Sequence, residues 1–206
     1  MLLGALPATW SHQVLTARLN ALPAQVRVAV AAACAQHVLP LYECFFDEGI
    51  HDLGSAVSVA WRFACGEGLA GLEVMDAVRA ARDILNEEQE EEGTSPARIG
   101  AAVCEAVSYL LSALEADALP LSEERAEQSI RMAHAAVVHF ARYEDGYEDV
   151  VDEWGVQEQQ WQERVLCFAE KGAAPAAVRA FVARDDTTLG WSKRVQTEYG
   201  DPHESD

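Results

Sequence analysis

PAQVRVAVAAACAQHVLPLYECF, residues 23–45, is the stretch that indicates how this chain folds. Its apolar residues recur at helical spacing, and one face of the resulting helix carries Val26, Val30, Cys34, His37, Leu41 and Phe45. Pro23 suits the first turn of such a helix, whereas Pro40 is expected to kink it. The stretch therefore predicts one long apolar helix near the start of the chain.

The same helical period continues on both sides of this stretch. Further helices are expected at about 9–21, 52–65, 70–90, 96–114, 122–140 and 147–168, with a short last one from Pro175. No segment shows the alternation of a half-buried strand. The sequence thus predicts an all-α fold, a single bundle of about eight helices over residues 1–184. A polar C-terminal tail that frays is expected at 185–206.

Local residue types refine this picture. Asp52 is the residue type that favours a helix N-cap, and Gly155 is expected to interrupt the seventh helix softly. Trp61 and Trp161 lie on the apolar faces of their helices, which places them in the core. A histidine on an apolar stripe, such as His37, is typical of a buried side chain bonded to a neighbour.

The net charge of the chain indicates which classes of partner it is expected to bind. It has 34 acidic and 15 basic residues and a formal net charge of −19. A field of that sign repels nucleic-acid phosphates and anionic lipid, so neither nucleic acid nor a membrane surface is an expected partner. It attracts cations and basic proteins. The alternative is that acidity only keeps the protein in solution.

The cysteines and the hydropathy of the chain indicate the cellular compartment in which the protein is expected. The five cysteines are scattered and form no CxxC pair, which is typical of a reducing environment. MLLGALPATW, residues 1–10, lacks the basic region and the long apolar run of a signal peptide. No run approaches ~18 uninterrupted apolar residues, the minimum for a membrane span. We therefore expect a cytoplasmic protein.

Acidic residues gather in two places. EEQEEE, residues 87–92, is the composition of a solvated helix end. EDGYEDVVDE, residues 144–153, differs because aromatic residues are interleaved with its six acids. This mixture favours a partner-binding surface, for which the candidate residues are Tyr143, Glu144, Asp145, Tyr147, Glu148, Asp149, Asp152 and Glu153. The alternative is that Tyr147 and Trp154 are core positions of the seventh helix.

One motif suggests chemistry. His51-Asp52-Leu53-Gly54 resembles the metal-binding core of HD-type phosphohydrolases, in which a metal-bound water attacks a phosphate ester. Gly49 interrupts any helix that would deliver the pair, and Ser55 stands where those enzymes usually have lysine. No HExxH, GxSxG, Walker A or GxGxxG pattern occurs. We therefore expect no enzyme, no catalytic residue, no metal and no cofactor. A metal-dependent hydrolase using His51 and Asp52 is the less favoured alternative.

Three segments carry a family resemblance: AAACAQHVLPLYECF (31–45), AVSVAWRFACGEG (56–68) and EAVSYLLSALEAD (105–117). They resemble the uncharacterised all-helical bacterial family typified by YjaG, and the related all-helical immunity proteins of polymorphic toxin systems. The resemblance implies a helical bundle that binds a partner. For the immunity branch the partner is a cognate toxin, here one with a basic surface and directed at nucleic acid or nucleotides. A housekeeping YjaG-like protein without a toxin is the alternative.

Overall fold

The computed structural model describes residues 12–46, 49–68, 71–90, 95–112, 114, 122–145 and 148–184. Within these ranges the chain forms eight α-helices and no strand, which confirms the predicted all-α bundle. The helices are α1 (His12–Asn20), α2 (Ala24–Glu43), α3 (Ile50–Ala64), α4 (Gly71–Glu90), α5 (Ser95–Ser112), α6 (Ser122–Asp145), α7 (Glu148–Glu170) and α8 (Pro175–Arg184). The predicted tail at 185–206 lies outside the described residues.

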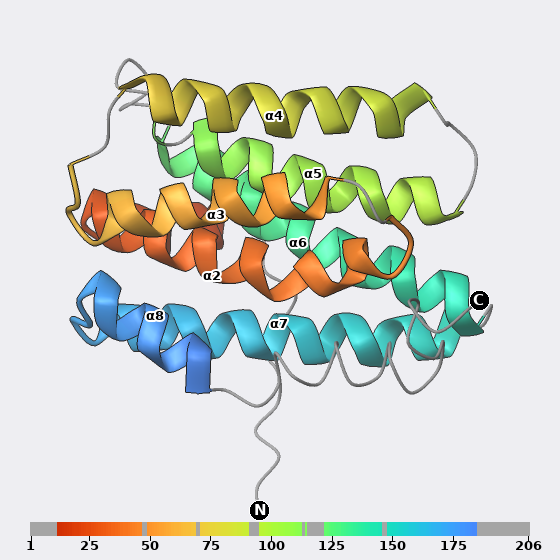
Figure 1. Ribbon diagram of the computed structural model, residues 1–206. Coiled ribbons are helices and arrows are strands. Elements are labelled where there is room, and N and C mark those ends of the chain that lie inside the picture. The colour runs from red at the N-terminus through yellow and green to blue at the C-terminus, as the bar shows by residue number, and fades with distance from the viewer. Residues whose placement is uncertain are drawn as a thin grey trace, which may run out of the picture.

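Helix α2 is the centre of the bundle. It contacts α3, α5, α6, α7 and α8, and Figure 1 shows α4 on one side of the α2–α3 layer and α7 with α8 on the other. Every residue from 28 to 35 is buried, so the helix is enclosed on all sides along this stretch. The single apolar stripe predicted from the sequence was therefore too narrow. Because these residues are alanine, valine and cysteine, neighbouring helices can approach α2 closely.

The start of α3 corrects one sequence prediction. The N-cap is Gly49, with a φ of 82°, and Asp52 lies inside the first helical turn rather than at its cap. A β-carbon at Gly49 would lie 3.1 Å from the Tyr42 hydroxyl and 3.2 Å from Ile84 Cδ1. Glycine is needed there both for the left-handed backbone and for the close approach. Asp52 still favours the helix N-terminus electrostatically.

Gly155 does not interrupt α7, and that prediction was wrong. The helix runs continuously from Glu148 to Glu170. A β-carbon at Gly155 would lie 3.3 Å from Val138 Cγ2 and 3.4 Å from His134 Nε2. The same histidine nitrogen lies 3.1 Å from the Gly155 carbonyl oxygen. The glycine therefore allows α6 and α7 to pack closely.

Two arginines fasten α1 to the bundle. Buried Arg27 donates through Nε to the Leu19 carbonyl at 3.0 Å, which satisfies a carbonyl at the C-terminal end of α1. Arg18 reaches α7, where its guanidinium lies 2.7 Å from carboxylate oxygens of both Glu170 and Glu163. Hydrogen bonds to these two carboxylates raise the pKa of Arg18 above its usual value. Directed polar contacts thus hold α1 in addition to the burial of Leu15 and Leu19 in the core.

Large aromatic side chains fill the core. Trp61 and Trp161 are each only 2% exposed, which confirms their predicted burial. The Trp61 indole nitrogen donates to Gln36 Oε1 at 2.7 Å, so α2 and α3 are also joined by a polar contact.

Among the described helices, none combines the length and the hydropathy needed to cross a bilayer.

Candidate functional site

A buried polar cluster joins α2 to α7. His37 Nδ1 lies 2.8 Å from Glu158 Oε2, and the exposed fraction of each residue is 1%. Gln162 Nε2 donates to the second carboxylate oxygen of Glu158 at 2.9 Å and to the Ile130 carbonyl at 3.2 Å. The His37 ring stacks on Trp161 with 3.8 Å between ring centroids. The predicted burial of His37 is confirmed, and the polar neighbour closest to its Nδ1 in this cluster is Glu158, which the sequence did not indicate.

Cys34 lies one helical turn before His37 and adds a thiol to this cluster. Burial, and then the nearby charge of Glu158, raise the pKa of the Cys34 thiol well above its usual value. A nucleophilic cysteine needs a lowered pKa and access to substrate. Cys34 has neither, because its exposed fraction is 0%. The combination of cysteine, histidine and glutamate is therefore suited to holding helices together rather than to nucleophilic catalysis.

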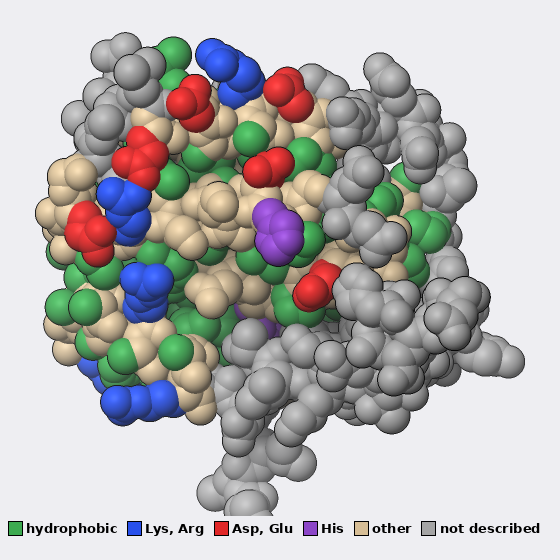
Figure 2. Space-filling view, viewed as in Figure 1, with side chains coloured by type: hydrophobic (Ala, Val, Ile, Leu, Met, Phe, Trp, Pro, Cys, Tyr) green, Lys and Arg blue, Asp and Glu red, His purple; other side chains and the backbone are tan. Residues whose placement is uncertain are grey.

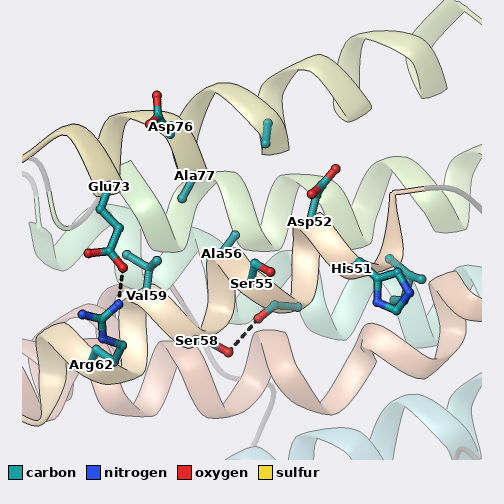
Figure 3. A pocket seen from close by; sticks show the side chains of 13 residues that line it. His51, Asp52, Ser55, Ala56, Ser58, Val59, Arg62, Glu73, Asp76 and Ala77 are labelled. Atoms are coloured by element: carbon teal, nitrogen blue, oxygen red, sulfur yellow. Dashed lines mark hydrogen bonds and ion pairs between the residues drawn. The ribbon is translucent and has the colours of Figure 1, made fainter. Parts of the chain in front are cut away.

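A groove of about 800 Å³ lies between α3 and α4 (Figure 3). Both helices supply small side chains to its lining, and His51 and Asp52 come from the first turn of α3. The lining residues are Ile50, His51, Asp52, Gly54, Ser55, Ala56, Ser58, Val59, Arg62, Glu73, Asp76, Ala77 and Ala80. The groove is thus the described surface on which the candidate HD-type motif lies.

Among the described residues, the motif lacks the further ligands of an HD-type centre. His51 and Asp52 are both exposed, and Figure 3 shows their side chains pointing in different directions. An HD-type centre needs a further histidine and aspartate from neighbouring helices. Among the described residues, no three His, Cys, Asp or Glu side chains gather closely enough to hold a metal ion. The donor set around His51 and Asp52 therefore does not fit that chemistry.

Arg62 is the basic residue of the groove, and its charge is already engaged. Its Nε lies 3.1 Å from Glu67 Oε2, and its Nη1 forms an ion pair with Glu73. These contacts, with Glu67 the larger contributor, raise the pKa of Arg62 above its usual value. On α4, Asp76 Oδ1 lies 3.7 Å from Arg79 Nη1, and both side chains are mostly exposed. Two of the three carboxylates that line the groove, those of Glu73 and Asp76, thus each lie beside an arginine.

The predicted partner-binding residues fall where α6 ends and α7 begins. We call Tyr143, Glu144, Asp145, Tyr147, Glu148, Asp149, Asp152 and Glu153 the acidic junction. The first three end α6, and the last four lie in the opening turns of α7. Tyr147 lies outside the described residues, as do the side chains of the other seven. The structure therefore places their backbone but does not test the predicted surface.

Trp154 follows the acidic junction on α7. It is 8% exposed, and its ring centroid lies 5.7 Å from that of Phe140 on α6. For Trp154, the alternative of a core position is thus correct. The aromatic pair fixes the first turns of α7 against the end of α6.

Comparisons with known proteins leave the function open. No family model matches the chain, and no curated protein matches it. Its fold is similar to the crystal structure of a DUF416 family protein from Shewanella baltica OS155, with a TM-score of 0.63 and 18% sequence identity over 89% of this chain and 93% of that one. At this identity the likeness shows the fold alone, shared with a member of an uncharacterised bacterial family. It does not bear on the narrower resemblance to YjaG or to immunity proteins.

Proposed function

We propose that this chain acts by binding a protein with a basic surface, and specifically that it is a cytoplasmic immunity protein that blocks a cognate bacterial toxin. The observation that carries the proposal is the acidic junction. It places six carboxylates and no basic residue within residues 144–153, in a chain whose net charge is −19. The fold it shares with the DUF416 protein is compatible with this role but assigns none.

The chemistry of the target explains why acids would be concentrated there. A toxin directed at nucleic acid or nucleotides needs a cationic cleft to neutralise phosphates. Carboxylates offered to that cleft accelerate association, since complementary fields steer the encounter. Next to the junction, the rings of Trp154 on α7 and Phe140 on α6 are in contact, with 5.7 Å between their centroids.

A binding role without catalysis is part of the proposal. The cluster around His37 and Glu158 is closed to solvent, and Cys34 beside it has a raised thiol pKa. The exposed pair His51 and Asp52 gathers no further ligand among the described residues. Neither arrangement supplies an accessible nucleophile with a base and an orienting group. These features support a bundle whose polar residues serve packing and recognition.

The proposal can be tested in the source cell. The tagged chain is purified at low salt, and proteins that are released by raising the salt are identified by mass spectrometry. The gene of each released protein is then expressed alone and together with this chain. We expect one partner that stops growth when expressed alone and allows growth in the presence of the chain. Partners without toxicity, or toxicity that the chain does not relieve, would favour the housekeeping alternative.

A further inference from the structure

We propose that a pocket between α1, α6 and α7 binds a small neutral aromatic molecule that carries an N–H or O–H donor, such as an indole or a phenol. The pocket has a volume of about 280 Å³. It shares no lining residue with the groove between α3 and α4 or with the acidic junction. The inference is independent of the proposed toxin partner. It rests on the size of the pocket, its apolar walls and a nearly buried hydrogen-bond acceptor.

The size and the walls of the pocket suit one or two rings. Leu15 from α1 and Ile130 from α6 are buried, and Met132 and Ala135 on α6 are partly buried. An apolar cavity of ~150 Å³ holds benzene, and pockets for drug-sized ligands begin at ~300 Å³. At about 280 Å³ the space admits a two-ring molecule. The thioether of Met132 favours an aromatic ring, because sulfur makes favourable contacts with such rings.

Gln162 on α7 supplies the acceptor. The residue lines the pocket and is only 2% exposed. Its Nε2 donates to Glu158 Oε1 at 2.9 Å and to the Ile130 carbonyl at 3.2 Å, so turning the amide over would break both bonds. Among the described residues, no group donates to Gln162 Oε1. An acceptor that is nearly buried and held in one orientation favours a ligand that donates to it.

His134 on α6 shows the same preference for a donor. Its Nε2 lies 3.1 Å from the Gly155 carbonyl oxygen. A carbonyl oxygen can only accept, so Nε2 carries a proton, and in the neutral ring Nδ1 is then an acceptor. His134 lines the pocket together with Gln162. Two of the polar residues in the lining therefore favour an N–H or O–H group on the ligand.

The charge of the lining favours a neutral ligand. Figure 2 shows acidic and basic side chains close together on the face that carries α3 and α4. In contrast, none of the described residues that line the pocket is acidic, and Arg131 is the one arginine among them. Arg131 Nη1 lies 3.6 Å from Oε1 of buried Glu127, which offsets its charge. A charged ligand would lose its hydration here without gaining a free counter-ion.

The first experiment is isothermal titration calorimetry of the full chain with 3-methylindole and with 1-methylindole. The two probes have the same size, but only 3-methylindole keeps the ring N–H. We expect 3-methylindole to bind with a Kd of roughly 0.05–1 mM and 1-methylindole to bind about tenfold more weakly. The donor is changed on the ligand because a change at Gln162 would also remove a hydrogen bond to Glu158.

A second experiment places the binding in this pocket. Ala135→Leu extends a side chain of the lining and should weaken 3-methylindole binding about tenfold or more. Ala80→Leu is the matched control, because Ala80 is also a partly buried alanine on a helix but lines the groove between α3 and α4. It should leave the Kd unchanged. Circular dichroism melting verifies that both variants are folded.

Three results would overturn the inference. The first is that the wild-type chain does not bind 3-methylindole, and the second is that both probes bind with equal Kd. The third is that Ala135→Leu and Ala80→Leu have the same effect on 3-methylindole binding. The comparison of the two probes needs only the wild-type chain, so it decides the matter even if Ala135→Leu does not fold. Relief of toxicity is measured separately, so the proposed function can fail or hold independently.

Discussion

His37 Nδ1 on α2 lies 2.8 Å from Glu158 Oε2 on α7, and only 1% of the surface of each residue is exposed. Withdrawing such groups from water is costly, and the mutual contact together with the amide of Gln162 offsets that cost. The pair fixes the register between two helices that are far apart in sequence. Removing one partner should therefore lower the free energy of unfolding by more than the net contribution of the pair, because the other polar group stays buried without its partner.

The first prediction concerns this pair. Glu158→Ala should lower the free energy of unfolding by about 3–5 kcal/mol, because it creates a cavity and leaves His37 without its buried carboxylate. Glu158→Gln should cost less, since the amide keeps the size and part of the hydrogen bonding. Urea unfolding followed by circular dichroism measures both.

A double-mutant cycle provides the control for that prediction. His37→Ala and Glu158→Ala, alone and together, should show a coupling energy within the range of ~0.5–3 kcal/mol found for residues in contact. Strictly additive effects would mean that the two side chains do not interact in solution. Wild-type stability of Glu158→Ala would mean that Glu158 is not buried.

The second prediction concerns Trp161, whose ring stacks on His37. Trp161→Ala should destabilise the fold by about 3–5 kcal/mol, because a large buried side chain is replaced by a cavity. Gln160→Ala is the neighbouring control, since Gln160 is exposed on the same helix. Its effect should stay within about 0.5 kcal/mol. Comparable decreases in melting temperature for the two variants would contradict the burial of the Trp161 face of α7.

Glu158 also shows which structural features could be predicted from the sequence and which could not. The helices were predictable because apolar residues recur at helical spacing, and the buried faces of Trp61 and Trp161 followed from the same period. Trp154, Glu158, Trp161 and Val165 share one face of α7, so the position of Glu158 on an apolar face could have been read from its spacing. Its partner could not, because helical periodicity does not indicate which helix packs opposite.

Other features depended on tertiary contacts. The role of Gly49 as the N-cap of α3 follows from its closeness to Tyr42 and Ile84, which are distant in sequence. Glycine often marks the end of a helix, but Gly155 lies inside α7 and allows α7 to pack closely against α6. The groove between α3 and α4 was not anticipated either, because its shape depends on which residues of two helices lie opposite each other. Of its polar residues, only His51 and Asp52 belong to a motif that the sequence makes recognisable.

The third prediction concerns pH. Partial burial raises the pKa of Glu105 on α5 above its usual value. The folded state then holds the proton more tightly than the unfolded state, so stability is lost as pH rises from the ordinary glutamate pKa, about 4.3, through the raised folded value. Glu105→Gln should therefore stabilise the protein at pH 7 and have little effect near pH 3.5. Urea unfolding of both proteins at the two pH values is the test. An equal change in the free energy of unfolding at both pH values would mean that the pKa of Glu105 is not raised in the folded state.

The fourth prediction concerns metal. Purified protein should contain no stoichiometric manganese, iron or zinc, and His51→Ala should change neither its metal content nor its melting temperature. The reason is that His51 and Asp52 are exposed and gather no third ligand among the described residues. Elemental analysis after purification without chelators gives the answer. Stoichiometric metal that disappears in His51→Ala would restore the phosphohydrolase hypothesis.

The fifth prediction returns to the acidic junction and is measured with the partner recovered from the source cell. Changing Glu148 to Gln, with Asp149 and Asp152 to Asn, should slow association and flatten its salt dependence, because long-range attraction between opposite charges accelerates encounter at low salt. The dissociation rate should change less, since steering acts before contact. Some of these acids also favour the N-terminus of α7 electrostatically, so a loss of stability of a few tenths of a kcal/mol up to ~1 kcal/mol is expected. The matched control neutralises Glu43, Asp83 and Glu124, three exposed acids on other parts of the bundle. It removes the same net charge, so an association rate reduced equally in both variants would assign the effect to overall charge rather than to the junction.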